Sequence, residues 1–151
     1  MKRLQLLLLG VLCVLALSAA PAPAGAAVSK RGDRMMDAIN FVRADAGLRP
    51  LRRSRRLVRS SAARAELMMR NDFFAHPAQL AVPTFNALGE VLALHGGHRP
   101  QTRSTLRRWA NSSGHRSVIL AREFRWVGAA RAVGRYHGNR ATIWVVRFGR
   151  K

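Results

Sequence analysis

The sequence predicts a single α+β domain in which helices pack against a small antiparallel sheet. Apolar residues recur at helical spacing through most of the chain, whereas two β-type apolar runs, residues 126–133 and 141–148, lie near its end. Gly134, Gly138 and Asn139 between these runs favour a turn, so the runs predict an antiparallel hairpin. Helices first and strands last is the order typical of an α+β domain.

The first 26 residues have the three parts of a secretory signal peptide. Lys2 and Arg3 precede an apolar stretch, residues 6–17, and Ala24-Gly25-Ala26 forms a cleavage site of the small-x-small type. The apolar stretch is shorter than the roughly 20 residues of a membrane-spanning helix, and no later segment approaches that length. The predicted organisation is therefore a signal peptide at 1–26, a linker at 27–34 and one domain at 35–151. The mature protein is expected to lack a transmembrane segment and to be secreted, either extracellular or associated with the cell envelope.

Composition limits the chemistry of the mature chain. Its one cysteine, Cys13, lies in the signal peptide, so the mature chain is expected to have no disulfide and no thiol nucleophile or ligand. The chain has 27 basic and 7 acidic residues and a formal net charge of +20, nearly all of it from arginine. This balance favours an anionic partner such as a cell-envelope polymer or a lipid surface. Nucleic acid is less favoured, because the tryptophans are expected in core and sheet packing rather than in base stacking. A coding bias toward arginine is the alternative explanation.

Four helices are expected. Asp33 is a cap for the first, and Gly47 and Pro50 stop it. Ser54 caps the second, whose apolar residues and arginines fall on opposite faces. Gly114 is expected to separate the third from the fourth. The predicted boundaries are Asp33 to Gly47, Ser54 to Asn71, 102–110 and 115–122.

The segment between the second and third helices is less regular. Residues 78–86 have a weak pattern, and Pro83 argues against a regular element there. Residues 89–94 are compatible with a short strand or a helical turn. Residues 95–100 contain two glycines and a proline, so they predict a loop.

Three polar residues next to turn-forming residues are the candidate site. His115 follows Gly114, between a helix that carries Trp109 and an apolar run. Glu90 follows Gly89, and His76 precedes Pro77. A histidine on a turn of this kind is positioned to meet a ligand.

Five segments, taken in order, resemble the CAP superfamily of cysteine-rich secretory proteins, antigen 5 and pathogenesis-related proteins, in its bacterial secreted form. Residues 39–51 resemble the opening helix and its N-x-x-R-x-x-x-G-L-x-P-L exit. Residues 73–76 resemble the F-x-H loop, and residues 89–93 resemble G-E-N-I-A. Residues 109–120 resemble W-x-x-S-x-G-H-R-x-x-I-L, and residues 142–149 resemble the closing strand.

The resemblance implies an α-β-α sandwich with a cleft where His76, Glu90 and His115 gather. Two positions depart from the family pattern. Val91 stands where the family usually has Asn, and Ser112 stands where many animal and plant members have a second cleft Glu. The set of acidic and imidazole groups is therefore incomplete.

Three functions fit these residues. The first is a non-catalytic extracellular binding or interaction module whose cleft is centred on His76, Glu90 and His115. The second is a metal-dependent hydrolase in which His76 and His115 hold zinc or another divalent metal, while Glu90 completes the coordination or accepts a proton from metal-bound water. In the third, the basic chain binds an anionic envelope polymer. A hydrogen-bonded cluster of the same three residues without chemistry is the structural alternative.

The other polar candidates carry less weight. His95 and His98 flank two glycines and are expected to be solvated, although such a pair can bind metal adventitiously. His137 is expected in a turn. Ser112 and Ser113 are expected to cap a helix or turn, since no nucleophile-elbow pattern surrounds them.

Overall fold

A four-stranded mixed sheet forms the middle layer of the computed structural model, which describes residues 24–151. The strands are β1 (Arg52–Arg53), β2 (Ala87–Gly96), β3 (Trp126–Tyr136) and β4 (Asn139–Arg150), in the spatial order β1-β3-β4-β2. β4 pairs antiparallel with both β2 and β3, and β1 pairs parallel with β3. β2 is therefore an edge strand.

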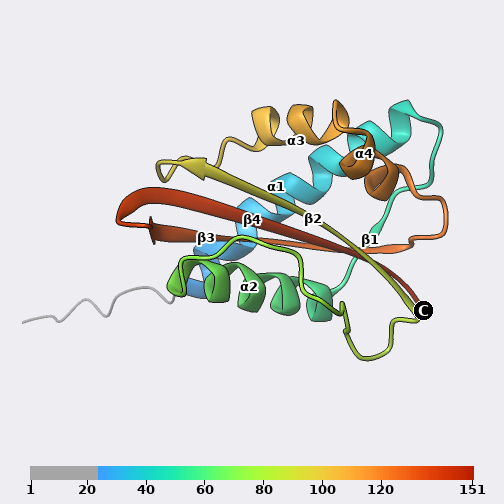
Figure 1. Cartoon of the computed structure of the whole chain (residues 1–151). Coiled ribbons are helices and arrows are strands. Elements are labelled where there is room, and N and C mark those ends of the chain that lie inside the picture. Colours follow the sequence, from blue (N-terminus) through green and yellow to red (C-terminus); the bar gives the residue numbers. More distant parts are fainter. Residues whose placement is uncertain (1–23) are drawn as a thin grey trace, which may run out of the picture.

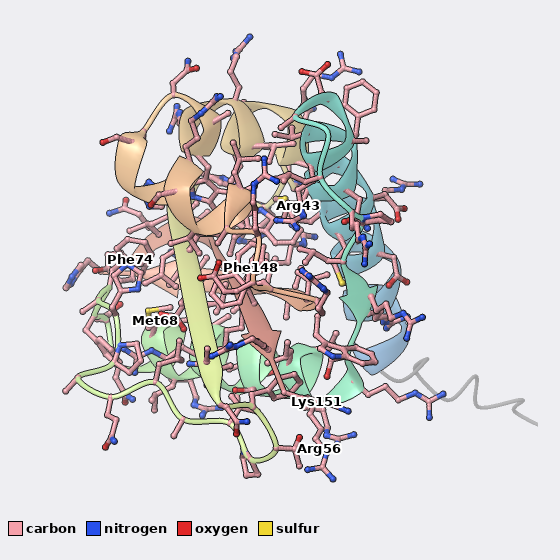
Figure 2. All side chains as sticks on the ribbon, turned by 90° about the vertical axis from the view of Figure 1, so that its right-hand side faces the viewer. Arg43, Arg56, Met68, Phe74, Phe148 and Lys151 are labelled. Atoms are coloured by element: carbon pink, nitrogen blue, oxygen red, sulfur yellow. The ribbon has the colours of Figure 1, made fainter. Side chains whose placement is uncertain are left out.

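Helices cover both faces of this sheet. α1 (Ala24–Asp45), α3 (Thr102–Ala110) and α4 (Ser113–Leu120) lie on one face, and α2 (Arg55–Arg70) lies on the other (Figure 1). Alternate residues of β4 point to opposite layers. Phe148 belongs to the apolar cluster under α1, α3 and α4, whereas Ile143 belongs to the cluster that includes Met68 of α2 (Figure 2). The predicted α-β-α sandwich is confirmed.

Several predicted elements have the expected bounds. Ser54 caps α2, and its Oγ accepts a hydrogen bond from the backbone N–H of Leu57. α3 spans the predicted residues 102–110. The hairpin of β3 and β4 is also confirmed, and it turns at His137 and Gly138, both with positive φ. Two such residues in a two-residue loop are the signature of a type I′ turn. Gly134, expected in the turn, lies inside β3.

The predicted start of the first helix is wrong. α1 begins at Ala24, so the expected linker, residues 27–34, forms its early turns. Asp33 lies inside the helix, where its carboxylate pairs with Arg53 at 3.0 Å instead of capping. Gly32 does not break the helix because it packs closely on β3: a Cβ there would lie 2.4 Å from the carbonyl oxygen of Ala129. Most of the predicted signal peptide, residues 1–23, lies outside the described residues.

Other differences concern the sheet and α4. β1 was not predicted, since two exposed arginines give no strand pattern, and it makes the sheet mixed rather than purely antiparallel. β2 is a full strand of ten residues and includes His95 and Gly96, which were expected in a loop. Gly114 lies inside α4 rather than ahead of it. Among residues 24–151, no helix combines the length and the hydropathy of a membrane-spanning segment.

Two side chains at the end of α1 hold the helical layer together. The Asn40 amide donates to the carbonyl oxygen of Leu51 and accepts from its N–H, at 3.1 and 2.8 Å. The buried Arg43 guanidinium donates to the carbonyl oxygens of Ile119 and Ala121, at 2.7 and 3.0 Å. A cation at the carboxyl end of a helix is favourable, so Arg43 fixes the end of α4.

The contact between α2 and β3 leads to the first prediction. A Cβ at Gly128 would lie 2.3 Å from backbone atoms of Leu57 and Val58, and backbone cannot yield as a side chain can. Gly128→Ala is therefore expected to lower the free energy of unfolding by about 2–3 kcal/mol. Chemical denaturation measures this change. Gly96→Ala is the control, since nothing lies within 4 Å of its added Cβ. Equal stability of the two variants would contradict the close approach.

Candidate functional site

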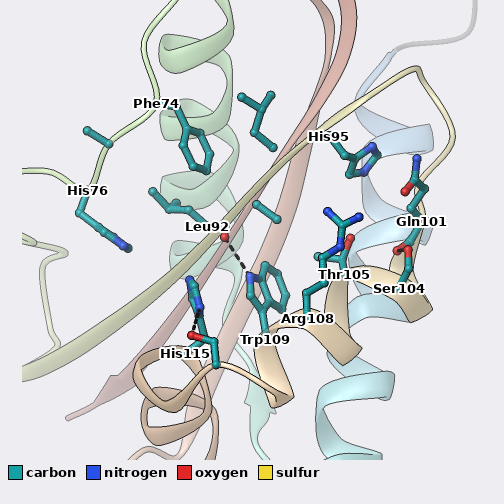
Figure 3. A pocket seen from close by; sticks show the side chains of 14 residues that line it. Phe74, His76, Leu92, His95, Gln101, Ser104, Thr105, Arg108, Trp109 and His115 are labelled. Atoms are coloured by element: carbon teal, nitrogen blue, oxygen red, sulfur yellow. Dashed lines mark hydrogen bonds between the residues drawn. The ribbon is translucent and has the colours of Figure 1, made fainter.

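A cleft of about 450 Å³ lies along the edge strand β2. The loop after α2, with Phe74 and His76, forms one wall, and α3 and the start of α4 form the other (Figure 3). The indole N–H of Trp109 donates to the carbonyl oxygen of Leu92 at 2.9 Å, which holds α3 against the strand. The side chains that line the cleft belong to Phe74, Ala75, His76, Leu92, Ala93, Leu94, His95, Gln101, Ser104, Thr105, Arg108, Trp109, Ser112 and His115.

Glu90 is buried beside this cleft and paired with an arginine. It lies on β2 directly opposite Arg147 of β4, and Arg147 Nε donates to Glu90 Oε2 at 2.8 Å. Both side chains are buried, with 3% of Glu90 and 8% of Arg147 exposed. Arg147 also donates to the backbone and hydroxyl oxygens of Ser60 on α2. The two oxygens of the Glu90 carboxyl group are therefore both engaged inside the protein, one by Arg147 and the other by His76.

His76 is oriented by the second oxygen of the same carboxylate. Its Nδ1 donates to Glu90 Oε1 at 3.0 Å, and more than half of the side chain, 57%, is exposed. The Nε2 atom is left for the cleft. A histidine in contact with a buried carboxylate has a fixed ring orientation and tautomer.

His115 reaches the cleft from α4, on the opposite wall. Its Nδ1 is hydrogen-bonded to the Ser112 hydroxyl at 2.9 Å, and its ring lies 6.4 Å from the Trp109 ring, centroid to centroid. Burial, first, and the charge of His76, second, lower the pKa of His115 below its ordinary value of 6.5. The two imidazoles lie on facing sides of the cleft (Figure 3).

The structure thus brings all three predicted residues to one place, with one difference from the expected cluster. Glu90 contacts His76 but makes no hydrogen bond to His115, whose partner is Ser112. Ser112, which stands where many animal and plant members have a second cleft Glu, therefore orients the His115 imidazole through its hydroxyl. The roles of these residues in binding or catalysis stay predictions.

The two histidines suit a metal better than the carboxylate does. Each imidazole uses Nδ1 in a hydrogen bond within the protein and presents Nε2, the usual arrangement of metal-binding histidines. Glu90 does not fit as a third ligand, because His76 and Arg147 engage its two oxygens. Within residues 24–151, no three His, Cys, Asp or Glu side chains form a group that could hold a metal ion.

Sequence reasoning missed four residues of this region. Arg147 was assigned only to the closing strand, although a charge inside the apolar run 143–148 is a signal for a buried partner. Ser112 was matched to the family's second cleft Glu and expected to cap a helix, and it does stand at the N-cap of α4, but its hydrogen bond to His115 was not predicted. His95 was expected to be solvated. Arg108, on the outer part of α3, was not singled out at all. Ser112, His95 and Arg108 line the cleft, whereas Arg147 lies behind it.

Comparison with known proteins places the chain in a family. The sequence model of the CAP family, the cysteine-rich secretory protein family, matches residues 36–148. The chain belongs to the CAP family. No curated protein matches the CAP chain closely enough to be counted as a relative.

Solved structures share the fold of this CAP domain. An outer surface protein of Borrelia burgdorferi is 20% identical, with a TM-score of 0.69, and the match covers 82% of this chain and 95% of that one. An extracellular protein of Bacillus anthracis that contains an SCP domain is 23% identical, with a TM-score of 0.62. That match covers 82% of this chain but only 41% of the Bacillus protein. Venom allergen-like protein 4 of Schistosoma mansoni is 13% identical, with a TM-score of 0.64 over 80% of this chain and 88% of its own.

The buried pair leads to a prediction about stability. Glu90→Gln leaves the Arg147 charge buried without a counter-charge, so the free energy of unfolding is expected to fall by about 3 kcal/mol. Glu66→Gln is the control, because the Glu66 pair with Arg70 is exposed and changes stability by less than about 0.5 kcal/mol. Both variants are compared by urea denaturation. A loss no greater than that of the control would show that the Glu90 pair does not stabilise the fold.

The His115 pKa leads to a second prediction. NMR titration of the wild type is expected to give a His115 pKa below 6.5. His76→Gln removes the smaller of the two causes, so it is expected to raise the pKa of His115 without restoring the ordinary value. His98→Gln, outside the cleft, is expected to leave the value unchanged. A wild-type pKa at or above 6.5 would contradict the burial of the ring.

Proposed function

We propose that this chain is a secreted CAP domain that binds a small ligand, without turning it over, in the cleft centred on His76, Glu90 and His115. The main support for this proposal is that Glu90 is bonded to other residues of the protein through both of its carboxylate oxygens. Its buried carboxylate has one oxygen on His76 and the other on Arg147, so it orients a histidine and is not presented to a substrate. A general acid or base has to reach the reacting proton directly or through one water.

The shape and lining of the cleft support ligand binding. Its volume of about 450 Å³ lies within the range of small-molecule sites, roughly 300–1,000 Å³. Apolar side chains from β2 and the Phe74 loop form much of its lining, and a few imidazole, hydroxyl and guanidinium groups converge on it. Such a combination is typical of sites that select a ligand by shape and a few polar contacts.

Two observations support secretion. The first 26 residues have the pattern of a signal peptide. The names of two structural relatives describe an outer surface protein and an extracellular protein. We therefore place the mature chain outside the membrane, in the medium or at the cell envelope.

Metal binding is the second candidate, favoured by the free Nε2 atoms of His76 and His115. These two residues would hold zinc or another divalent ion, and Glu90 would orient His76 from behind. A bound ion would supply Lewis acidity and lower the pKa of bound water. Calorimetric titration with zinc tests this candidate, and binding that is lost in both His76→Ala and His115→Ala would support it.

The arginine-rich surface supports a further partner, an anionic polymer of the cell envelope. Arg55, Arg56 and Arg59 are exposed on α2, on the side away from the sheet. Binding through such charges is expected to weaken steeply as salt increases.

A binding experiment and a turnover experiment together test the proposed function. The neutral probe phenylbutyramide is titrated into ¹⁵N-labelled protein, and the three tryptophan indole N–H signals are followed. We expect a saturable shift of the Trp109 signal, because Trp109 lines the cleft, while Trp126 and Trp144 serve as internal controls. Absence of a Trp109 shift both with this amide and with its anionic counterparts, phenylbutyrate and phenylpropyl phosphate, would contradict the ligand cleft.

Turnover is tested with peptide, glycan and ester substrates. We expect no hydrolysis. Activity that is present in the wild type and lost in His115→Ala would overturn the non-catalytic assignment. The control is His137→Asn, at an exposed turn outside the cleft where asparagine tolerates the left-handed backbone.

A further inference from the structure

The cleft has a second polar end, formed by residues outside the His76, Glu90 and His115 group. Arg108 of α3 and His95 of β2 line it, with Gln101 beside them (Figure 3). Of the fourteen described residues that line the cleft, none is acidic. Glu90, behind His76, is buried and balanced by Arg147. The groups that face the cleft are therefore neutral or cationic.

His95 has a polar atom without a partner at this end. Its Nδ1 donates to the backbone oxygen of Gly96 at 3.2 Å. Its Nε2 is buried and has no hydrogen-bond partner in the described part of the chain. Buried polar atoms are nearly always paired, so an unpaired one at a cleft wall indicates a place for a ligand atom. This atom accepts from a ligand hydroxyl when the ring is neutral and donates to a ligand oxygen when the ring is protonated.

Arg108 contributes an uncommitted positive charge next to that atom. It is exposed, and among the described residues its guanidinium has neither a hydrogen bond nor an ion pair. Its side chain extends toward His95 (Figure 3). Arg131 and Arg147 differ, because their guanidinium groups are already bonded to protein oxygens. A free guanidinium recognises carboxylate or phosphate through paired N–H groups.

The space between the two polar ends is apolar. Leu92 and Leu94 of β2, Phe74 of the loop and Trp109 of α3 line it. A ligand that extends from His76 and His115 to Arg108 therefore lies along apolar side chains.

We propose that the cleft takes an amphipathic organic anion, with its apolar body against Phe74, Leu94 and Trp109 and its carboxylate or phosphate group between Arg108 and His95. This inference rests on the proposed function, since it names the class of ligand that the cleft binds. Arg108 determines the preference for charge, and His95 in its protonated form donates its Nε2–H to the anionic group and fixes its position.

Three matched probes test the preference: phenylbutyrate, its neutral amide phenylbutyramide, and phenylpropyl phosphate. The Trp109 indole signal reports binding in each titration. We expect at least one anion to bind about tenfold more tightly than the amide, because a charge-assisted hydrogen bond exceeds a neutral one. The comparison of phenylbutyrate with phenylpropyl phosphate identifies which anionic group the site prefers.

Two variants assign the preference to Arg108. Arg108→Gln is expected to reduce the affinity for the preferred anion about tenfold and to leave the affinity for the amide unchanged. Arg107→Gln removes the same charge from the next position of α3, which does not line the cleft, and is expected to retain the preference. His95→Gln is expected to weaken anion binding while the fold, checked by circular dichroism, is retained.

The outcomes separate this inference from the proposed function. If the amide binds as tightly as both anions, or if Arg107→Gln and Arg108→Gln weaken the anion equally, the inference fails and the ligand cleft stands. If no probe shifts the Trp109 signal, the ligand cleft and the inference both fail.

Discussion

The ion pair between Glu90 and Arg147 connects the fold to the site. The two residues face each other across β2 and β4, and both are buried against α2. Arg147 extends the connection to Ser60 of α2, and Glu90 extends it to His76 in the loop that follows α2. Sheet, helix and loop therefore depend on one carboxylate. A buried pair of this kind is stable only when each charge has its partner, so the register of β2 against β4 and the position of His76 are set together.

This pair also decides which groups are available to a ligand. Glu90 contacts Arg147 and His76, so the negative charge near the cleft is paired inside the protein. What remains at the surface of the cleft are imidazoles, hydroxyls and the Arg108 guanidinium. The groups that face the cleft of this strongly basic chain are therefore neutral or cationic, and the reason is the local pairing of Glu90 rather than the net charge.

Elements with local sequence signals were predicted correctly. Features that depend on a contact between distant residues, such as the start of α1, were not. The Ser54 cap and the apolar face of α2 are local, and so are the turn residues between β3 and β4, which is why these elements were found. The start of α1 was missed because Asp33 looks like a cap, and only the fold brings Arg53 to its carboxylate. His76, Glu90 and His115 were found as a group through the family pattern. The partners that orient them, Arg147 and Ser112, could not be assigned, because cross-strand register and the geometry of a helix start are not readable from spacing.

The position of the cleft follows from the need to cover an edge strand. β2 has a neighbour on one side only, and an open edge invites pairing with other chains. Trp109 bonds to the carbonyl oxygen of Leu92 and brings α3 over that edge, while the loop with Phe74 lies on the other side. The two coverings are also the two walls of the cleft. Exposed wall residues such as Arg108 are outside the apolar core, so they can change with little effect on folding, and the chemical character of the cleft can vary while the edge stays covered.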